Sequence, residues 1–261
     1  MPKLSVVIPV YYNQDTLELV YDDLKNVVFT TIKDYELVMV DDGSGDESWQ
    51  KMKMIAEKDE RVKIIKLSRN FGSHAACLAG LTASTGDCVT IKAADLQEPS
   101  DIILDMYRKW EEGNKVVLAV RKDREEGISQ KLFAGMYYSL VRKFALSNMP
   151  KGGFDCYLLD RKVVHVLEQL DETNSAITLQ ILWAGFKTDI VYYVRKKREI
   201  GKSKWTLAKK IKLVIDSLLS FSFTPIRFIA GVGMAFSSIA FVWMLVVLCT
   251  KIFAGISSFS V

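Results

Sequence analysis

Short apolar runs alternate with longer amphipathic stretches over the first 120 residues of the chain. Five mostly apolar runs have the length and composition of buried strands, at residues 4–10, 35–40, 62–67, 88–91 and 115–120. The segments between them carry apolar residues at helical spacing or are compatible with a helix, at residues 16–28, 47–58, 74–84 and 100–112. This alternation predicts an α/β fold with a mostly parallel sheet and helices on both faces.

A second group of segments follows the alternating part. Residues 128–147 carry aromatic and aliphatic side chains at helical spacing and predict a helix. A Gly-Gly pair at 152–153 breaks this pattern, and residues 156–159 resume an extended run. Residues 179–183 and 190–194 complete the soluble body.

The end of the chain is apolar enough to enter a membrane. Between Arg227 and Lys251, the 23 residues 228–250 contain no charged side chain. At about 1.5 Å per residue this helix would exceed a hydrocarbon core of about 30 Å. Residues 205–223 have an amphipathic pattern, which predicts a helix that lies in the membrane interface. We therefore expect three parts: a cytoplasmic catalytic domain at 1–200, a basic loop with the interface helix at 201–225, and a transmembrane helix with a short tail at 226–261.

The positive charge of the chain is concentrated in one segment. The net charge is +4, but residues 195–212 contain nine basic side chains against one glutamate, a net of +8. The rest of the chain therefore carries 4 − 8 = −4. Such local basicity argues against a general nucleic-acid-binding protein and favours a directed anionic partner, including an anionic lipid bilayer.

Other classes of site are excluded by what the sequence lacks. Its four cysteines form no CxxC pair and it has two histidines, which argues against a zinc site and a disulfide framework. The N-terminus has no long apolar signal core, so nothing in it indicates secretion. No GxGxxG or GxxxxGK[ST] motif follows the first predicted strand, so the usual dinucleotide and P-loop motifs are absent.

Acidic and amide side chains follow two of the predicted strands, where each strand ends. Asp41 and Asp42 follow the second strand, and the segment KAADLQEPS, with Asp95, Gln97 and Glu98, follows the fourth. Open parallel sheets bind ligands at this edge, and oxygen ligands suit a hard divalent cation that also contacts substrate phosphates. Each segment, taken alone, is more typical of an ordinary polar turn than of a ligand site.

Asp155 is a third candidate, because it follows the Gly-Gly turn. Catalytic groups are often carried by such loops, although a capping or turn role would place an aspartate there as well.

Six motifs stand in order along nearly the whole chain. They are VVIPVYYN at 6–13, VDDGSGDES at 40–48, SRNFGSHAA at 68–76, ADLQEP at 94–99, Asp155 with LLDR at 158–161, and RxxGxSKW at 198–205. In this combination the chain resembles the family 2 glycosyltransferases that transfer one sugar to a polyprenyl-phosphate lipid, relatives of dolichol-phosphate mannose synthase.

The resemblance implies a GT-A (Rossmann-like) fold, a UDP-sugar donor and a Mg²⁺ or Mn²⁺ cofactor. It places Asp155 at the position of the catalytic base, and Asp95 and Gln97 at the metal. It assigns the donor nucleotide sugar to Pro9, Tyr11, Asp41, Asp42, Arg69, Asp95 and Arg121. It assigns the phosphates of donor and lipid to Arg198, Ser203 and Lys204.

The sequence departs from the family pattern in three places. Ala93 replaces the first acid of the family's DADLQ, so one expected metal or donor ligand is missing. Asp155 is followed by Cys-Tyr-Leu in place of Phe-Arg-Leu, which removes an arginine. Bacterial members often have two terminal membrane helices, so we expect a second span to be missing from this chain.

The function implied is transfer of a single hexose or N-acetylhexosamine from a UDP-sugar to polyprenyl (undecaprenyl) phosphate. The reaction would be inverting and metal-dependent, at the cytoplasmic face of the membrane, in the synthesis of a cell-envelope glycan. A catalytically impaired, membrane-tethered nucleotide-sugar-binding protein is one alternative, because of Ala93. A processive polysaccharide synthase is less favoured, because Leu182 stands where its QxxRW motif requires arginine. A homo-oligomer is left open, and no nucleic-acid partner is expected.

Overall fold

The computed structural model describes residues 2–124, 128–170, 176–196 and 207–255, with no description of the side chains of 123–134, 207–210 and 254–255. The chain divides into two compact units, Met1–Ser220 and Phe221–Val261.

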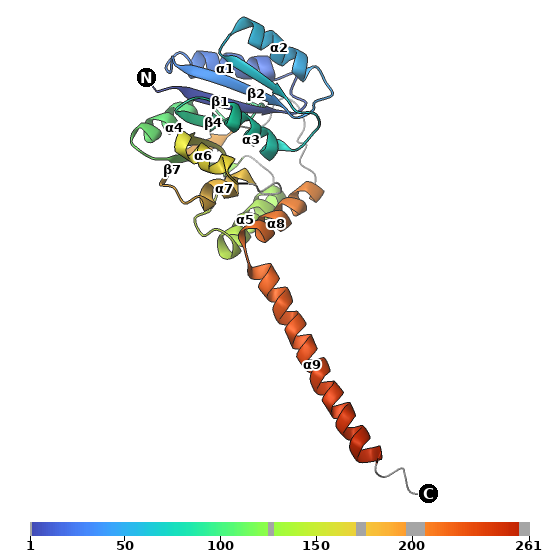
Figure 1. The fold of residues 1–261 in the computed structure, drawn as a ribbon. Helices are drawn as coiled ribbons and strands as arrows, with labels where there is room; N and C mark the ends of the chain where they lie inside the picture. The colour runs from blue at the N-terminus through green and yellow to red at the C-terminus, as the bar shows by residue number, and fades with distance from the viewer. Residues whose placement is uncertain (1, 125–127, 171–175, 197–206, 256–261) are drawn as a thin grey trace. The chain divides into compact units, whose positions relative to one another are not determined.

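In the described part of the chain, the first unit is built on a seven-stranded sheet with the order β3-β2-β1-β4-β6-β5-β7 (Figure 1). The strands are β1 (Leu4–Val10), β2 (Tyr35–Asp41), β3 (Val62–Lys66), β4 (Cys88–Ile91), β5 (Val116–Arg124), β6 (Phe154–Asp160) and β7 (Thr188–Arg195). β6 pairs antiparallel with β4 and β5, and every other neighbouring pair is parallel. The prediction of a mostly parallel sheet is confirmed.

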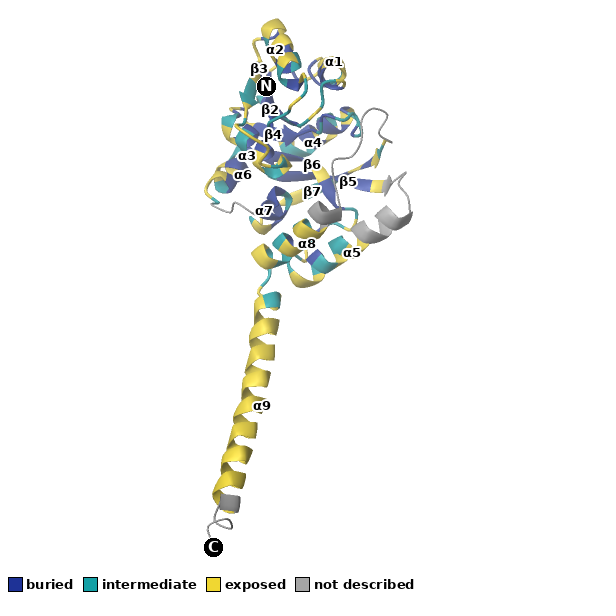
Figure 2. Ribbon diagram, turned by 90° about the vertical axis from the view of Figure 1, so that its right-hand side faces the viewer, coloured by how far each residue is buried: buried dark blue, intermediate teal, exposed yellow. Residues whose placement is uncertain are grey.

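Helices cover both faces of this sheet, as predicted. The helices described in this unit are α1 (Leu17–Val27), α2 (Ser48–Lys58), α3 (Ser73–Ala83), α4 (Asp101–Glu111), α5 (Ile128–Phe144), α6 (Arg161–Glu168), α7 (Ile177–Trp183) and α8 (Leu207–Phe221). α1, α2 and α4 contribute to one core cluster with the strands, while α3 packs against β1 and β2 and contacts α6 and α7. Figure 2 colours the central strands between these layers as buried, while the edge strands β3 and β7 are partly exposed.

The alternation of side chains along β1 explains the two layers. Leu4, Val6 and Ile8 belong to the core cluster that includes α1 and α4. Val7 points to the opposite face, because successive side chains of a strand alternate, and there it meets α3 at Gly80. Both faces of the central strands are therefore buried, which explains why they read as continuous apolar runs.

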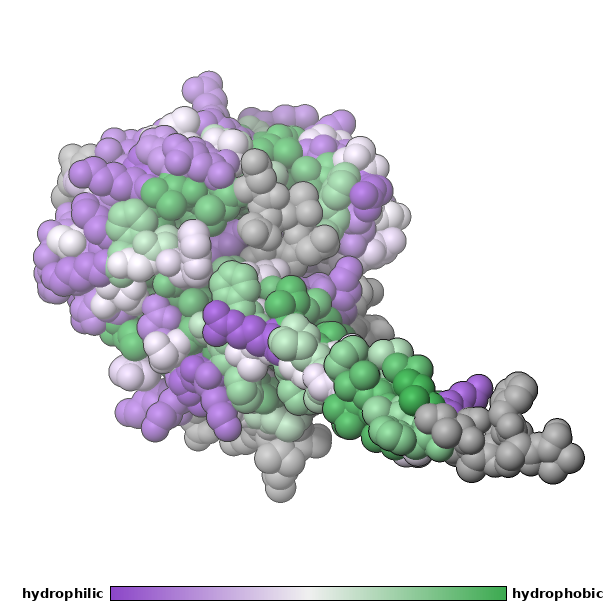
Figure 3. Space-filling view, turned by 60° about the horizontal axis from the view of Figure 1, so that its bottom comes forward, coloured by the Kyte–Doolittle hydropathy of each residue, from purple (hydrophilic) through white to green (hydrophobic). Residues whose placement is uncertain are grey.

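The second unit is one long helix, α9 (Thr224–Gly255). Its residues Thr224–Phe253 are long and apolar enough to cross a membrane, judged by length and composition. Its side chains are exposed in Figure 2, and Figure 3 shows mostly hydrophobic side chains along its visible side.

Candidate functional site

One edge of the sheet collects the ends of most strands. β1, β2 and β4 are parallel neighbours, so their carboxyl ends lie at the same edge. β6 runs antiparallel to β4, so its first residues come to this edge as well. Because Tyr157 pairs with Ile91, Asp155 in β6 lies level with Ala93 in the loop after β4. β5 and β7 also end here, since both run antiparallel to β6.

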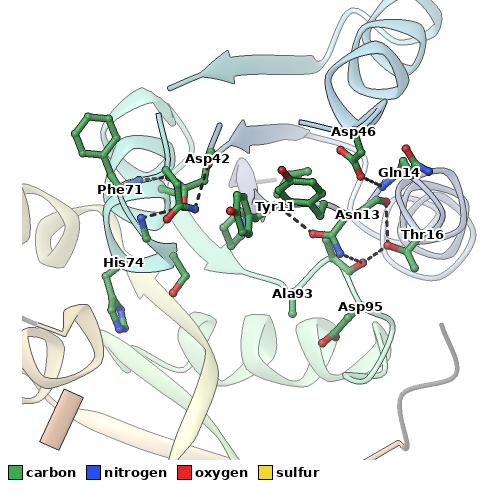
Figure 4. Close-up of a pocket in the computed structure, with 18 of the residues that line it drawn as sticks. Tyr11, Asn13, Gln14, Thr16, Asp42, Asp46, Phe71, His74, Ala93 and Asp95 are labelled. Atoms are coloured by element: carbon green, nitrogen blue, oxygen red, sulfur yellow. Dashed lines mark hydrogen bonds between the residues drawn. The ribbon is translucent and has the colours of Figure 1, made fainter. Parts of the chain in front are cut away.

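A cavity of about 750 Å³ opens at this edge. Pro9, Tyr11, Asp42 and Asp95 line it, together with Ala93 (Figure 4). It lies between the ends of β1 and β4, where the order of the strands reverses and where open α/β sheets bind ligands. Its volume suits a small-molecule ligand.

Hydrogen bonds join the loop after β1 to the loop after β4. The Thr16 hydroxyl donates to the carbonyl oxygen of Ala94 at 2.5 Å, and Asn13 Nδ2 donates to the same oxygen at 3.4 Å. Asn13 Oδ1 accepts from the backbone N–H of Tyr11 at 3.0 Å, as Figure 4 shows. The two walls of the cavity are therefore held to each other.

The Asp42 carboxylate shapes the third wall. Asp42 is 2% exposed, and its Oδ1 accepts from the backbone N–H of Phe71 at 2.7 Å. Its Oδ2 accepts from the backbone N–H of Gly72 at 2.9 Å and from Asn70 Nδ2 at 2.8 Å. Asp42 therefore holds the loop between β3 and α3 against the cavity.

Asp41 lies one residue earlier and is fully buried. Its Oδ1 accepts from the backbone N–H of Ser44 at 3.0 Å. Its Oδ2 is buried and has no hydrogen-bond partner among the described residues. An unpaired buried acceptor costs free energy, and Asp41 itself does not line the cavity.

Asp95 and Gln97 stand on a tight turn. Leu96 between them has a φ of 57°, a left-handed conformation that non-glycine residues rarely adopt. Gln97 N–H donates to Asp95 Oδ1 at 3.2 Å within this turn. Such local strain is often found where side chains are held for function.

The guanidinium of Arg195 lies among these side chains. Its Nη2 donates to Gln97 Oε1 at 2.8 Å and is 3.9 Å from Asp95 Oδ2. Its Nη1 is 3.8 Å from Asp155 Oδ2. The two residues predicted to bind metal and the predicted catalytic base therefore share one arginine, which the sequence analysis did not assign to the site.

Asp155 forms a second ion pair, with Arg121. The Arg121 side chain is 5% exposed and that of Asp155 is 46% exposed. Arg121 Nε donates to the Tyr193 hydroxyl at 3.4 Å, and burial raises the pKa of Tyr193 to about 12, so that hydroxyl stays protonated at neutral pH.

Gly153 lies two residues before Asp155 and has a φ of 64°, and a Cβ added there would overlap Tyr138. The turn before Asp155 therefore requires glycine.

Buried polar groups lie behind the loop that carries Asp95. Lys92 is 1% exposed and its Nζ donates to the carbonyl oxygen of Glu98 at 2.7 Å. Glu98 Oε2 accepts from the backbone N–H of Ala93 at 3.2 Å.

Burial raises the pKa of Cys77 to about 12 and also raises that of Cys156. Both thiols therefore stay protonated, which argues against a cysteine nucleophile here.

α8 supplies part of the cavity wall, through Lys212, Leu213 and Asp216. Its Ser217 is buried, and the Ser217 hydroxyl lies 3.1 Å from that of Tyr137 on α5. The sequence predicted an amphipathic helix here but not its contact with the cavity.

The donor atoms fit a divalent cation only in part. Within the described residues, no group of three or more His, Cys, Asp or Glu side chains could hold a metal. Asp95 and Gln97 offer one carboxylate and one amide oxygen beside the cavity. Mg²⁺ usually keeps several waters and relies on one or two carboxylates together with substrate phosphates. The residues therefore fit a cation that is shared with a diphosphate.

Several of the residues predicted for the site do not line the cavity or lie outside the described part of the chain. Asp41, Arg69, Gln97, Arg121 and Asp155 do not line the cavity. The Arg69 guanidinium stacks on the Phe71 ring at 4.0 Å from its centre. Arg198, Ser203 and Lys204 lie outside the described residues. No pattern in the sequence indicates a role for His74, which lines the cavity and whose pKa burial lowers.

Comparison with known proteins identifies the family. The family described as Glycosyl transferase family 2 matches residues 5–167. "Uncharacterized glycosyltransferase YkcC" of Bacillus subtilis (strain 168) is 38% identical over 250 residues, which cover 95% of this chain and 77% of that protein. "Bactoprenol glucosyl transferase" of Shigella phage SfX is 33% identical over 250 residues, which cover 94% of this chain and 81% of that protein.

Two solved structures share the fold at low sequence identity. The mannosyltransferase PcManGT from Pyrobaculum calidifontis, in complex with GDP-Man and Mn²⁺, is 19% identical with a TM-score of 0.54, over 76% of this chain and 58% of that one. S. aureus TarS 1-349, in complex with UDP-GlcNAc, is 16% identical with a TM-score of 0.53, over 85% of this chain and 74% of that one. The predicted GT-A fold is confirmed, and the chain belongs to glycosyl transferase family 2.

Proposed function

We propose that this glycosyltransferase moves a single hexose or N-acetylhexosamine from a UDP-sugar to a polyprenyl phosphate. The reaction takes place at the cytoplasmic face of a membrane, inverts the anomeric carbon and uses Mg²⁺ or Mn²⁺. The observation that carries the proposal is that Arg195 joins the cavity-lining Asp95 to Asp155. A donor-binding carboxylate and a candidate base are thereby set side by side.

Two features support a nucleotide-sugar donor. The cavity opens at the reversal of the strand order, and its volume of about 750 Å³ suits a ligand of this size. A structural neighbour, S. aureus TarS, was solved with UDP-GlcNAc.

Two features support a lipid acceptor. A relative that shares 33% identity over 94% of this chain is named for bactoprenol, a polyprenol. Ile211, Ile215 and Leu219 form an exposed apolar row on α8, the helix that also contributes Lys212 to the cavity wall. Such a row suits a helix that lies in the membrane interface.

The residues of the chain can assist the reaction in distinct ways. A lipid phosphate is largely a dianion at neutral pH, because its second pKa is near 6, so it can attack without full proton removal. Asp155 therefore orients the acceptor or accepts part of a proton, while Arg121 fixes the position of its carboxylate. Displacement in line at the anomeric carbon gives a β-linked product from an α-linked donor.

The negative charge of the departing diphosphate needs more electrostatic stabilisation than the acceptor does. Asp95 and Gln97 would hold the cation, which supplies Lewis-acid stabilisation of the leaving group when it is bound. Arg198, Ser203 and Lys204, outside the described residues, are proposed to bind the phosphates. Fixed positive groups at this point lower the barrier because they need no rearrangement during the reaction.

A product assay tests the proposal directly. The full chain, in detergent or in membranes, is incubated with undecaprenyl phosphate and one UDP-sugar at a time, and the lipid fraction is analysed by mass. A lipid carrying one hexose or one N-acetylhexosamine is the expected product. Asp155→Asn should strongly reduce the amount of product formed, while the matched variant Asp105→Asn, on the exposed face of α4, should leave it unchanged.

Two results would point to another function. UDP binding with no sugar transfer from any UDP-sugar would favour the catalytically impaired binding protein. A product with many sugars on one acceptor would favour a processive synthase.

A further inference from the structure

The described side chains around Arg195 form a balanced group of charges. Two carboxylates, of Asp95 and Asp155, face two guanidinium groups, of Arg121 and Arg195. Arg195 is the member that contacts both carboxylates, and its side chain is 17% exposed. It also donates to Gln97 Oε1 at 2.8 Å. The side chains of Asp95 and Arg195 are 11% and 17% exposed, so water screens the attraction between these two charges only in part.

The position of Arg195 is set by two strands. β7 is parallel to β5, and the register brings its last residues beside those of β5 at the cavity edge. Lys196 N–H donates to the carbonyl oxygen of Gln97 at 2.9 Å, and Gln97 Nε2 donates to the carbonyl oxygen of Lys196 at 3.1 Å. These bonds fasten the end of β7 to the turn that carries Asp95. The guanidinium is therefore held against the proposed metal ligands by the backbone.

We infer that Arg195 is a built-in cation that competes with the divalent metal for Asp95 and Gln97, and that the donor diphosphate relieves this competition. The inference rests on the proposed binding of metal and nucleotide at this site. A metal that arrives alone adds positive charge to a balanced group and must displace the guanidinium from its acceptors. A diphosphate brings negative charge, which offers Arg195 new acceptors and leaves Asp95 and Gln97 for the metal.

The competition has two opposite consequences. Without nucleotide, Arg195 weakens metal binding, since like charges repel and the ligand oxygens are engaged. Without metal, Arg195 strengthens diphosphate binding, since it supplies a positive charge at the site. Metal and nucleotide should therefore bind cooperatively, and removal of Arg195 should reduce that coupling, because coupling between two ligands is reciprocal.

The test is a set of titrations of the full chain in detergent by calorimetry. Mn²⁺ and UDP are each titrated alone and then in the presence of the other, for the wild type and Arg195→Gln. The variant should bind Mn²⁺ alone about tenfold more tightly, or about 1.4 kcal/mol, and should bind UDP alone more weakly. The factor by which UDP tightens Mn²⁺ binding should fall accordingly.

Two further variants separate the effect of this guanidinium from that of charge in general. Lys196→Gln removes the same charge from the next residue, whose side chain is exposed, and should leave Mn²⁺ affinity within about twofold. Arg195→Lys keeps the charge but loses the planar fork, so its gain in Mn²⁺ affinity should be smaller, about threefold. If Arg195→Gln does not fold, the inference is tested with Arg195→Lys.

Three results would overturn the inference. The first is Mn²⁺ affinity without nucleotide that stays within about twofold of wild type in the Arg195 variants, and the second is an equal gain in Lys196→Gln. The third is a wild type that binds no Mn²⁺ even with UDP present. None of these results depends on the lipid product, whose absence would instead count against the proposed acceptor and reaction.

Discussion

Arg121 and Asp155 form an ion pair across the neighbouring strands β5 and β6. The guanidinium is almost fully buried and the carboxylate is nearly half exposed. A buried cation that pairs with a partly exposed carboxylate fixes the direction of that carboxylate. This arrangement suits a group that orients a reactant more than a group that must gain and lose a proton.

Asp155→Asn tests this role. The amide keeps the shape of the side chain but loses the charge, so turnover should fall by about two orders of magnitude while UDP affinity stays within about threefold. Single-turnover product formation and calorimetry measure the two quantities. The matched control is Asp189→Asn. Asp189 lies at the start of β7 and pairs with Lys109, and this substitution should change neither turnover nor UDP affinity. Unchanged turnover in Asp155→Asn would remove Asp155 from the active site.

Asp95→Ala tests the proposed metal carboxylate. The variant should bind UDP with an affinity that no longer rises when Mn²⁺ or Mg²⁺ is added, because the protein has lost the carboxylate that shares the cation with the diphosphate. Calorimetry of UDP binding with and without metal gives the answer. Asp105→Ala, an exposed carboxylate paired with Arg108, should keep the metal effect. A retained metal effect in Asp95→Ala would show that another group holds the cation.

Ala93→Asp tests the missing acid. Ala93 lines the cavity two residues before Asp95, so a carboxylate there would add a second oxygen ligand. Mn²⁺ affinity without nucleotide should rise by about tenfold, while Ala93→Asn, of the same size without the charge, should give a smaller rise. Equal effects of the two substitutions would mean that added charge at this position does not reach the metal.

The bounds of the central strands and helices were predicted closely, because each of these elements has its own local pattern of apolar and polar residues. The predicted strand at 88–91 is found at Cys88–Ile91, and the predicted helix at 16–28 is α1, Leu17–Val27. Helix α6 was missed because it begins directly after β6, with Asp160 as its N-cap and no turn residues between them. The antiparallel direction of β6 was also missed, since the direction of a strand relative to its neighbours leaves no mark in its own pattern.

The candidate site was predictable in part for the same reason. Asp42 and Asp95 follow parallel strands, so their meeting at one edge follows from the fold class. The contact of Arg195 with Gln97 joins residues 98 positions apart, and nothing in the local sequence indicates it. The role of Asp42 was equally hard to predict, because its carboxylate accepts hydrogen bonds from backbone N–H groups of a loop that begins about 30 residues later.

Gly80→Ala should destabilise the packing of α3 on the sheet. An added Cβ would lie 2.2 Å from Val7 Cγ1 and 3.2 Å from Val40 Cγ2, so the helix must shift, at a cost of about 1–3 kcal/mol. Gly135→Ala in α5 is the matched control, because its added Cβ would meet no described atom within 4 Å apart from its chain neighbours and the nearby backbone of its own helix. Alanine is the better helix former, so this variant should gain about 0.5–1 kcal/mol. Thermal unfolding checks the opposite signs, and two shifts of the same sign would contradict the argument.

Glu36 is expected to make the stability of the first unit depend on acid pH. It is 2% exposed, and burial alone would raise its pKa, but hydrogen bonds from Lys63, Ser5 and Thr85 outweigh that effect. Its pKa falls from the ordinary 4.5 to about 2. A lowered pKa in the folded state stabilises the fold above the unfolded value, and the stabilisation is lost as pH falls from 4.5 towards 2.

The shift corresponds to about 3 kcal/mol at neutral pH, at about 1.4 kcal/mol for each pKa unit. Urea unfolding of the full chain in detergent, followed by tryptophan fluorescence, should therefore show Glu36→Gln to be about 2–3 kcal/mol less stable than wild type at pH 7. The difference should shrink as the pH approaches 3, because the wild-type carboxylate then becomes protonated in the unfolded chain. Glu18→Gln, in an exposed pair with Lys51, should change stability by less than about 0.5 kcal/mol at any pH. A difference for Glu36→Gln that is the same at pH 7 and pH 3 would mean that shape and packing, and not the ionised carboxylate, account for its contribution.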